Sequence, residues 1–114
     1  MRIAVVGTCA SGKSTIVAEL RRLGVDAFVV SQEHSSVRAL WNHLHPDLVV
    51  YLQVDYPIIQ QRRGNAWPRW IYDAQVQRLG DARVHADISV NTGDLTVAES
   101  ISRILAWIDQ NPLK

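Results

Sequence analysis

The strongest chemical signal in the chain is a glycine-rich stretch near its N-terminus. It fits the pattern G-x-x-x-x-G-K-[ST] and reads Gly7-Thr8-Cys9-Ala10-Ser11-Gly12-Lys13-Ser14. The two glycines let the backbone curl so that successive N–H groups point inward and can surround a chain of phosphates. Lys13 can then reach the β- and γ-phosphates, and the Ser14 hydroxyl can coordinate Mg²⁺. This stretch therefore predicts a site for a nucleoside phosphate.

The segments on either side supply the frame that such a loop requires. Residues 2–6 form a short apolar run, as expected for a buried parallel strand. Apolar residues recur at helical spacing over residues 14–23, and Gly24 ends the pattern. The positive N-terminal end of that helix favours a bound phosphate. The alternative is a plain glycine turn between a strand and a helix, which requires neither Lys13 nor Ser14.

Strands and helices alternate along the rest of the chain. Strands are predicted over residues 25–30, 47–54 and 87–90, helices over residues 36–45, 56–63, 68–82 and 97–111, and a loop over residues 65–67. This alternation indicates an α/β fold in which helices cover both faces of a parallel sheet. The minimal arrangement is a single three-layer α/β/α domain over residues 1–114, with about four strands in the order 2-1-3-4.

Composition limits the classes of protein to which the chain can belong. Of its 114 residues, 47% are hydrophobic and 20% are charged, which is enough for one globular core. The net charge of +1 makes neither nucleic acid nor a membrane an expected partner. The single cysteine can form no internal disulfide, and no apolar run is long enough to span a bilayer, so a cytoplasmic location is expected. The four histidines lack the spacing of a zinc site.

These residues make the chain resemble the P-loop kinases of nucleotides and small metabolites. The glycine-rich stretch matches their Walker A motif. Residues 46–55, followed by a helix that ends in Arg62-Arg63, are similar to the later strand and the lid of nucleoside and nucleotide kinases. Residues 85–92, followed by a helix, are similar to the last strand of shikimate-kinase-like and dephospho-coenzyme-A-kinase-like proteins. The resemblance covers most of the chain and implies a phosphotransferase that uses ATP and Mg²⁺.

Two features depart from the family pattern. Only residues 35–45 separate the second and third predicted strands, where such kinases carry an inserted acceptor-binding segment. A separate Walker B strand that ends in an aspartate is missing, so the strand that leads to Glu33 would have to serve both purposes. The resemblance therefore leaves the phosphate acceptor open.

The resemblance also implies roles for charged residues outside the glycine-rich stretch. Glu33 corresponds to an acidic residue that acts as a base or supports the metal; the alternative is a solvated loop carboxylate. Arg62, Arg63 and Arg69 correspond to lid arginines, whose planar forks hold phosphate oxygens or stack on a base. For Arg62 and Arg63 the alternative is a solvated helix end, where cations are favourable.

Asn91 and Thr92 follow the last strand, where related kinases place the adenine; alternatively they form a turn. The predicted nucleotide-binding residues are Gly7, Ala10, Ser11, Gly12, Lys13, Ser14, Thr15, Arg62, Arg63, Asn91 and Thr92. The predicted catalytic residues are Lys13, Glu33, Arg62 and Arg69. The predicted metal ligands are Ser14 and Glu33.

The function that these residues predict is an ATP-binding, Mg²⁺-dependent phosphotransferase that acts on an unidentified small molecule. The shortened acceptor segment favours a second hypothesis, a nucleotide-binding regulatory module with little turnover. A GTPase is a further alternative, because Asn91 and Asp94 have the spacing of the guanine motif, although its lysine and the D-x-x-G switch motif are absent. Trp70 is expected to pack within the fold, and exposed tryptophans would be the sign of a homodimer.

Overall fold

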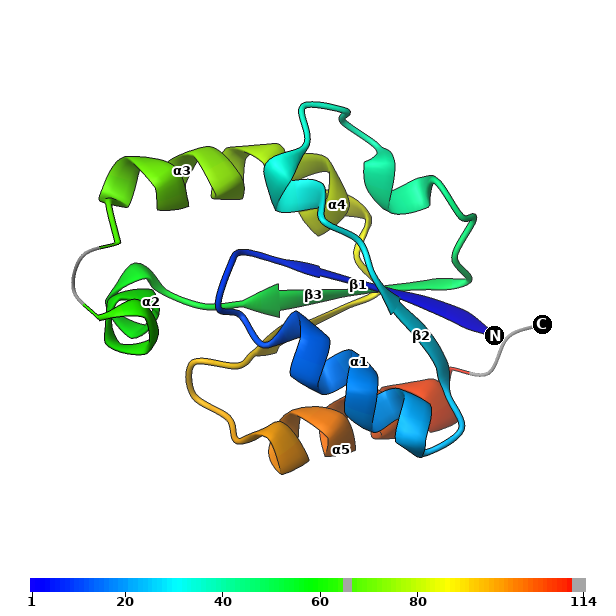
Figure 1. The fold of residues 1–114 in the computed structure, drawn as a ribbon. Helices are drawn as coiled ribbons and strands as arrows, with labels where there is room; N and C mark the ends of the chain where they lie inside the picture. Colours follow the sequence, from blue (N-terminus) through cyan, green and yellow to red (C-terminus); the bar gives the residue numbers. More distant parts are fainter. Residues whose placement is uncertain (65–66, 112–114) are drawn as a thin grey trace.

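The computed structural model describes residues 1–64 and 67–111 and contains a four-stranded parallel sheet in the order β2-β1-β3-β4 (Figure 1). The strands are β1 (Arg2–Gly7), β2 (Asp26–Val29), β3 (Leu48–Gln53) and β4 (Ile88–Asn91). Every strand begins and ends within one residue of its predicted range. The α/β fold class and the strand order predicted from the sequence are confirmed.

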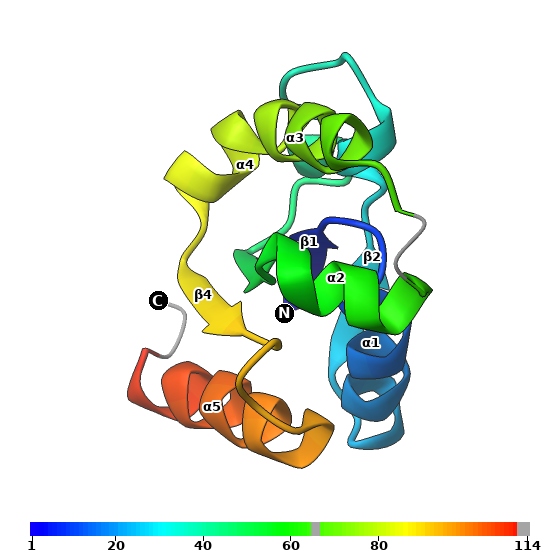
Figure 2. The same ribbon diagram turned by 90° about the vertical axis from the view of Figure 1, so that its left-hand side faces the viewer.

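Helices cover both faces of this sheet. They are α1 (Lys13–Arg22), α2 (Tyr56–Arg63), α3 (Arg69–Arg78), α4 (Gly80–His85) and α5 (Val97–Gln110), with two 3₁₀ turns, η1 (Gln32–His34) and η2 (Leu40–Asn42). The pair α1 and α5 lies on one face, and the pair α3 and α4 lies on the other (Figure 1). Figure 2 shows that α2 lies in front of the edge at which the carboxyl ends of the strands meet. The loops that follow the strands therefore lie beneath a helical cover.

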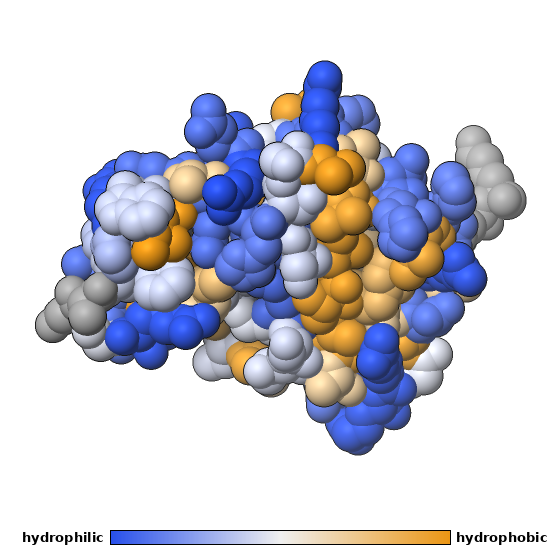
Figure 3. Space-filling model, turned by 45° about the horizontal axis from the view of Figure 1, so that its top comes forward, coloured by the Kyte–Doolittle hydropathy of each residue, from blue (hydrophilic) through white to orange (hydrophobic). Residues whose placement is uncertain are grey.

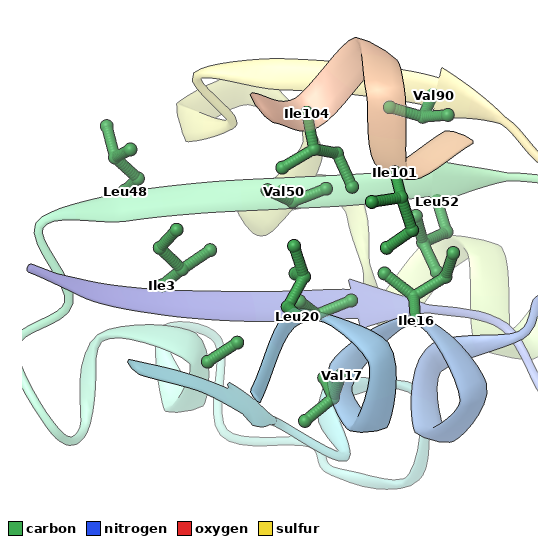
Figure 4. Close-up of a cluster of buried hydrophobic side chains, with 12 residues drawn as sticks. Ile3, Ile16, Val17, Leu20, Leu48, Val50, Leu52, Val90, Ile101 and Ile104 are labelled. Carbon is green, nitrogen blue, oxygen red and sulfur yellow. The ribbon is translucent and has the colours of Figure 1, made fainter. Parts of the chain in front are cut away.

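The two central strands, β1 and β3, are buried on both faces, which explains their almost continuous apolar sequence. On one face they pack against α1 and α5 in a cluster that contains Ile3, Val5, Ile16, Leu20, Val50, Leu52, Ile101 and Ile104 (Figure 4). On the opposite face, Leu79 and Ala82 from the α3–α4 pair cover Ala4, Val6 and Tyr51. Packing from both sides fixes the end of β1, where the glycine-rich loop begins.

The last helix begins where the sequence predicts. The Thr96 hydroxyl oxygen accepts a hydrogen bond from the Glu99 backbone N–H (3.1 Å), and the Glu99 carboxylate accepts one from the Thr96 backbone N–H (2.9 Å). This reciprocal capping box contributes about 1 kcal/mol to helix stability. It sets the direction in which α5 leaves the β4 loop and packs against α1.

The helix predicted over residues 36–45 is wrong, because this segment contains only turns and η2. The buried Gln32 side chain donates a hydrogen bond to the Val37 carbonyl (2.7 Å) and accepts one from the Trp41 N–H (2.9 Å). The Trp41 indole in turn donates to the Asp81 carboxylate (2.8 Å). These tertiary bonds occupy backbone groups that a helix would pair internally, so they override the helical spacing of the apolar residues.

The Asp81 carboxylate gives this region a testable pH dependence. The hydrogen bond from the Trp41 indole, together with Arg38 and His85, holds the pKa of Asp81 below its ordinary value. A carboxyl group with a lowered pKa in the folded chain stabilises the fold above its unfolded pKa of about 3.9, and the contribution is lost as pH falls through the folded value. We expect Asp81→Asn to lower the free energy of unfolding at about pH 7, and by less at about pH 3. Urea unfolding at both pH values measures the two differences, and equal differences would contradict the assignment.

The predicted helix over residues 68–82 is present as two helices that meet at Leu79. The Leu79 N–H bonds the carbonyls of Gln75 (3.0 Å) and Val76 (3.2 Å), and Gly80 then begins α4. Glycine costs a helix interior about 1 kcal/mol relative to alanine, which makes this the weakest point of the predicted helix. The break leaves Leu79 completely buried against the sheet. Part of the predicted 65–67 loop, residues 65–66, lies outside the described residues.

One face of the molecule carries a hydrophobic band between hydrophilic areas (Figure 3). Trp70 exposes 72% of its surface, so the expectation that it packs within the fold is wrong. An exposed tryptophan was the sign expected for a homodimer, and the homodimer stays a prediction.

Within residues 1–64 and 67–111, no helix is both long enough and apolar enough to cross a bilayer.

Candidate functional site

The glycine-rich loop joins the carboxyl end of β1 to the first turn of α1. A Cβ added to Gly7 would lie 2.5 Å from the Ser11 hydroxyl oxygen and 3.0 Å from the Leu52 carbonyl, so only glycine allows β1, β3 and the loop to approach so closely. Gly12 has a φ of +95°, which side chains disfavour. Ala10 has a φ of +62°, at a cost of about 1 kcal/mol for a residue other than glycine. The loop therefore follows the tightly curved path that its two glycines predict.

Lys13 bends back over this loop. Its Nζ donates hydrogen bonds to the carbonyls of Gly7 (3.0 Å) and Thr8 (2.9 Å) and lies 2.7 Å from Glu33 Oε2. The Lys13 and Glu33 side chains are only 10% and 3% exposed, so the alternative that Glu33 is a solvated loop carboxylate is wrong. Glu33 Oε1 is buried and has no hydrogen-bond partner among the described residues. The ion pair thus leaves one buried carboxylate oxygen without a partner among the described residues.

The position of Glu33 follows from the parallel sheet. β2 lies beside β1 with its carboxyl end at the same edge, and η1 turns the Glu33 side chain toward the loop. Arg78 on α3 donates a hydrogen bond to the Glu33 carbonyl (3.2 Å) and helps to hold this turn. Sequence reasoning placed Glu33 at this edge, but it gave no indication of the support from Arg78.

Arg62 connects α2 to the two loops beneath it. Its Nη1 donates to the Ala10 carbonyl (2.6 Å), and its Nη2 donates to the Thr92 carbonyl (2.5 Å). The buried Thr92 hydroxyl donates to the Ser11 carbonyl (2.7 Å), so the loop after β4 is fastened to the glycine-rich loop. Arg62 is an exposed residue in the last turn of α2, as in the helix-end alternative, but both ends of its guanidinium also bind backbone carbonyls.

The other predicted polar residues divide between the site and its surroundings. Arg63 lines a cavity beside Lys13, and its guanidinium lies 5.0 Å from the centre of the Trp67 ring. Arg69 pairs with the Asp73 carboxylate (3.3 Å) and, within the described residues, lines neither cavity beside the loop. Asn91 accepts a hydrogen bond from the Gly93 N–H (2.9 Å), which is the turn-forming geometry given as its alternative. Catalysis by Arg69 and nucleotide binding by Asn91 stay predictions.

No sequence pattern predicted the contacts among Cys9, Gln75 and His34, which form a polar group at the glycine-rich loop. The Gln75 side chain accepts a hydrogen bond from the Cys9 N–H (2.9 Å) and donates one to the Cys9 sulfur (3.2 Å). His34 Nε2 lies 3.4 Å from the same sulfur. These residues come from the glycine-rich loop, α3 and η1, so their sequence separations carry no motif. The signal that could have found Cys9 and His34 is that both follow strands that are neighbours in the predicted sheet.

Two cavities flank the glycine-rich loop, and Ala10, Gly12 and Thr15 line both. The first, called here the Arg62 cavity, has a volume of about 430 Å³ and is also lined by Arg62, Thr92, Leu95, Val97 and Ser100. The second, called here the Glu33 cavity, has a volume of about 370 Å³ and is also lined by Cys9, Lys13, Ser14, Glu33, His34 and Arg63. One ligand that crosses the loop can therefore occupy both.

A third cavity, of about 420 Å³, lies between residues 35–38 and the α3–α4 pair. It is lined by Arg38, Arg78, Asp81 and His85, and no residue of the glycine-rich loop reaches it. Arg38 and Asp81 already form an ion pair there (3.1 Å). Because the loop residues line the other two cavities and not this one, those two cavities form the candidate site.

The residues of the Glu33 cavity fit a phosphate chain and Mg²⁺. Mg²⁺ prefers oxygen ligands, and the Ser14 hydroxyl and the Glu33 carboxylate line the same cavity. The unpartnered Glu33 Oε1 provides an acceptor with no competing hydrogen bond among the described residues. Lys13 supplies a cation, and the N-terminus of the ten-residue α1 supplies a positive helix end.

Two solved structures share this fold despite low sequence identity. The chain is similar to shikimate kinase from Aquifex aeolicus, with a TM-score of 0.65 and 16% identity over 97% of this chain and 98% of that chain. It is also similar to the YorR protein from Bacillus subtilis, described in complex with phosphorylated GDP, with a TM-score of 0.61 and 16% identity over 100% of both chains. No protein-family model matches the sequence, and no curated protein matches it. The two likenesses show that the chain has a P-loop kinase-like α/β fold.

Proposed function

We propose that the chain binds a nucleoside triphosphate, ATP in the first instance, together with Mg²⁺, and transfers the terminal phosphoryl group to a small molecule. The observation that carries this proposal is the glycine-rich loop that lies between two cavities, with Ala10, Gly12 and the following Thr15 lining both. Lys13 lies in one of these cavities, where it can meet the phosphate chain. The kinase-like fold is consistent with this function.

The Arg62 cavity suits the base and sugar of the nucleotide. Leu95 and Val97 give it apolar walls, which is typical of a site for a planar ring. Ser11 and Ser100 also line this cavity, and their hydroxyl oxygens are buried without hydrogen-bond partners among the described residues. Guanine nucleotides belong in the test as well, because the YorR protein is described in complex with phosphorylated GDP.

The Glu33 cavity suits the phosphates and the acceptor. Mg²⁺ bound by the Ser14 hydroxyl and the Glu33 carboxylate would neutralise charge on the transferred group. Lys13 would exchange its Glu33 partner for phosphate oxygens, and the released carboxylate could then accept the proton of an acceptor hydroxyl. The γ-phosphorus–oxygen bond breaks as the acceptor oxygen attacks, and the nucleoside diphosphate leaves. The Lys13–Glu33 ion pair thus keeps both side chains beside the loop until the phosphates bind.

Calorimetry and a coupled assay for nucleoside diphosphate test this proposal. ATP and GTP are titrated with and without Mg²⁺, and diphosphate release is then followed with a panel of nucleosides, nucleotides and small hydroxy acids. Binding with acceptor-dependent release is the expected result. Failure of both nucleotides to bind would overturn the proposal. Binding without acceptor-dependent release would support a regulatory module, which the short, mostly irregular connection between β2 and β3 favours.

Arg62 provides a sharper prediction for the Arg62 cavity. Arg62→Ala removes the bonds to the Ala10 and Thr92 carbonyls, and it also removes a cation that lines the cavity. We expect nucleotide affinity to fall by about tenfold, which corresponds to one charged hydrogen bond. Calorimetry measures this affinity, and urea unfolding separates a loss of contact from a loss of fold. Arg22→Ala, which removes an exposed arginine paired with Glu19, is the matched control. An Arg62 variant with normal affinity would assign this residue to loop support alone.

A further inference from the structure

Three different metal-ligating groups meet beside the glycine-rich loop. Cys9 follows β1, whereas Glu33 and His34 belong to η1, which follows β2. One ligand atom from each residue can be chosen so that all three lie within 4.8 Å of one another. The Cys9 sulfur lies 3.4 Å from His34 Nε2, which lies 3.8 Å from Glu33 Oε2. A thiol, an imidazole and a carboxylate thus share one corner of the Glu33 cavity.

Two of the three spacings among these atoms are close to those of a tetrahedral metal site. Zinc–sulfur and zinc–nitrogen bonds of about 2.3 Å and about 2.0 Å place the two ligand atoms about 3.5 Å apart at tetrahedral angles. The observed Cys9–His34 distance is 3.4 Å. Two ligand atoms at about 2.0 Å lie about 3.3 Å apart, so the observed 3.8 Å between His34 and Glu33 requires a small adjustment. The exposed His34 side chain can make that adjustment.

The unpartnered Glu33 oxygen is an independent indication of a ligand. Glu33 lines the cavity, its side chain is 3% exposed, and its Oε1 is buried without a hydrogen bond among the described residues. A buried carboxylate oxygen in this state has a desolvation penalty that a cation would offset. Lys13 contacts Oε2, which is also the oxygen 3.8 Å from His34 Nε2, so a cation in this corner would replace the ammonium group at Oε2 or bind both carboxylate oxygens.

The surroundings favour a borderline-soft ion over Mg²⁺ for this set of ligands. Mg²⁺ selects oxygen, whereas thiolate and imidazole ligands select Zn²⁺ and similar ions. The Gln75 amide donates to the Cys9 sulfur (3.2 Å), which is the kind of supporting hydrogen bond that orients a metal ligand. The cavity leaves the fourth coordination position open to water.

We propose that Cys9, Glu33 and His34 form a binding site for a borderline-soft divalent cation, Zn²⁺ in the first instance, and that this ion and a nucleotide exclude each other. The first part depends only on the three residues. The second part rests on the proposed function, because the ion would occupy the Glu33 cavity and engage the carboxylate that the nucleotide's Mg²⁺ requires. The site would thus make nucleotide binding sensitive to free zinc.

Cobalt absorption tests the site without any nucleotide. The reduced, chelator-treated protein is titrated with Co²⁺, and a thiolate-to-cobalt charge-transfer band with intense tetrahedral absorption is expected; Zn²⁺ should then abolish both. Cys9→Ser should lose the charge-transfer band and weaken Zn²⁺ binding by about 100-fold, since changes to supporting residues alone cost 10–100-fold. His34→Ala, at an exposed position, should also weaken binding, and His43→Ala is the matched control. Absence of the band in the wild-type protein, or its persistence in Cys9→Ser, would overturn the proposal.

A second experiment tests exclusion. With free Zn²⁺ buffered at ten times its Kd, mutually exclusive binding lowers the apparent affinity for ATP about 11-fold. The effect should disappear in His34→Ala, at a Zn²⁺ concentration too low to load that variant. An ATP affinity that Zn²⁺ leaves unchanged would overturn the exclusion. If the chain bound no nucleotide at all, the proposed function would fail, while the cobalt experiment would still decide the metal site.

Discussion

Replacing Lys13 with alanine is expected to lower the affinity for ATP and Mg²⁺ by about 100-fold or more. The Lys13 ammonium group is 10% exposed and lies between loop carbonyls and Glu33, so water screens its charge only weakly. Removing one member of a buried charged pair commonly costs about 2–5 kcal/mol of binding free energy. Calorimetric titration of the variant with ATP in the presence of Mg²⁺ measures the change.

Loss of binding must be separated from loss of the fold, because Lys13 also neutralises a buried carboxylate. Lys13→Ala leaves Glu33 without its cation and should lower the free energy of unfolding by about 3–5 kcal/mol. The double variant Lys13→Ala with Glu33→Gln removes the uncompensated charge and should recover much of that stability, as measured by urea unfolding. We expect the double variant to fold and still not bind ATP. A folded double variant with wild-type affinity would remove Lys13 from the site.

The features that the sequence predicted correctly depend on local chemistry repeated along the chain. Apolar runs identify the strands, because both central strands are buried on both faces. The glycines of the loop have a steric reason: Gly7 has no space for a Cβ, and Gly12 has a positive φ. Parallel strand order then brings the end of β2 beside the loop, which is why Glu33 could be named in advance.

The features that the sequence did not predict depend on hydrogen bonds from side chains to the backbone of other segments. The apolar spacing over residues 36–45 predicted a helix, but the buried Gln32 amide binds the Val37 carbonyl and the Trp41 N–H and prevents it. The contact between Gln75 and Cys9 joins residues 66 apart in sequence, with no periodicity that could reveal it. Such side-chain hydrogen bonds depend on how layers pack, and packing is not encoded in any one segment.

For Arg62, the sequence predicted the position of the residue but not its hydrogen bonds. The sequence placed an arginine at the end of α2, near the loops. The structure adds that its guanidinium joins the Ala10 and Thr92 carbonyls. These two hydrogen bonds hold the glycine-rich loop and the loop after β4 together. A nucleotide that binds there must therefore replace or share the bonds. The direction in which a long, flexible side chain points depends on every acceptor within reach.

Glu33→Gln is expected to separate binding from turnover. The amide has nearly the shape of the carboxylate but cannot accept a proton, and a missing general base typically costs about 10²–10⁴ in rate. Nucleotide affinity should change much less than in Lys13→Ala, because glutamine still offers an oxygen and Lys13 loses a competing partner. The variant should also fold, since Lys13 retains its bonds to the Gly7 and Thr8 carbonyls.

Diphosphate release with an identified acceptor, or basal ATP hydrolysis in its absence, measures the turnover of this variant, and calorimetry measures its affinity. Glu19→Gln is the matched control, because Glu19 forms a surface pair with Arg22 on α1. Unchanged turnover in Glu33→Gln would limit Glu33 to holding Lys13 in the nucleotide-free protein. Loss of affinity that appears only with Mg²⁺ present would instead assign the carboxylate to the metal. One oxygen of Glu33 pairs with Lys13, and the other is unpartnered. The two outcomes therefore distinguish a carboxylate that holds Lys13 from one that binds Mg²⁺.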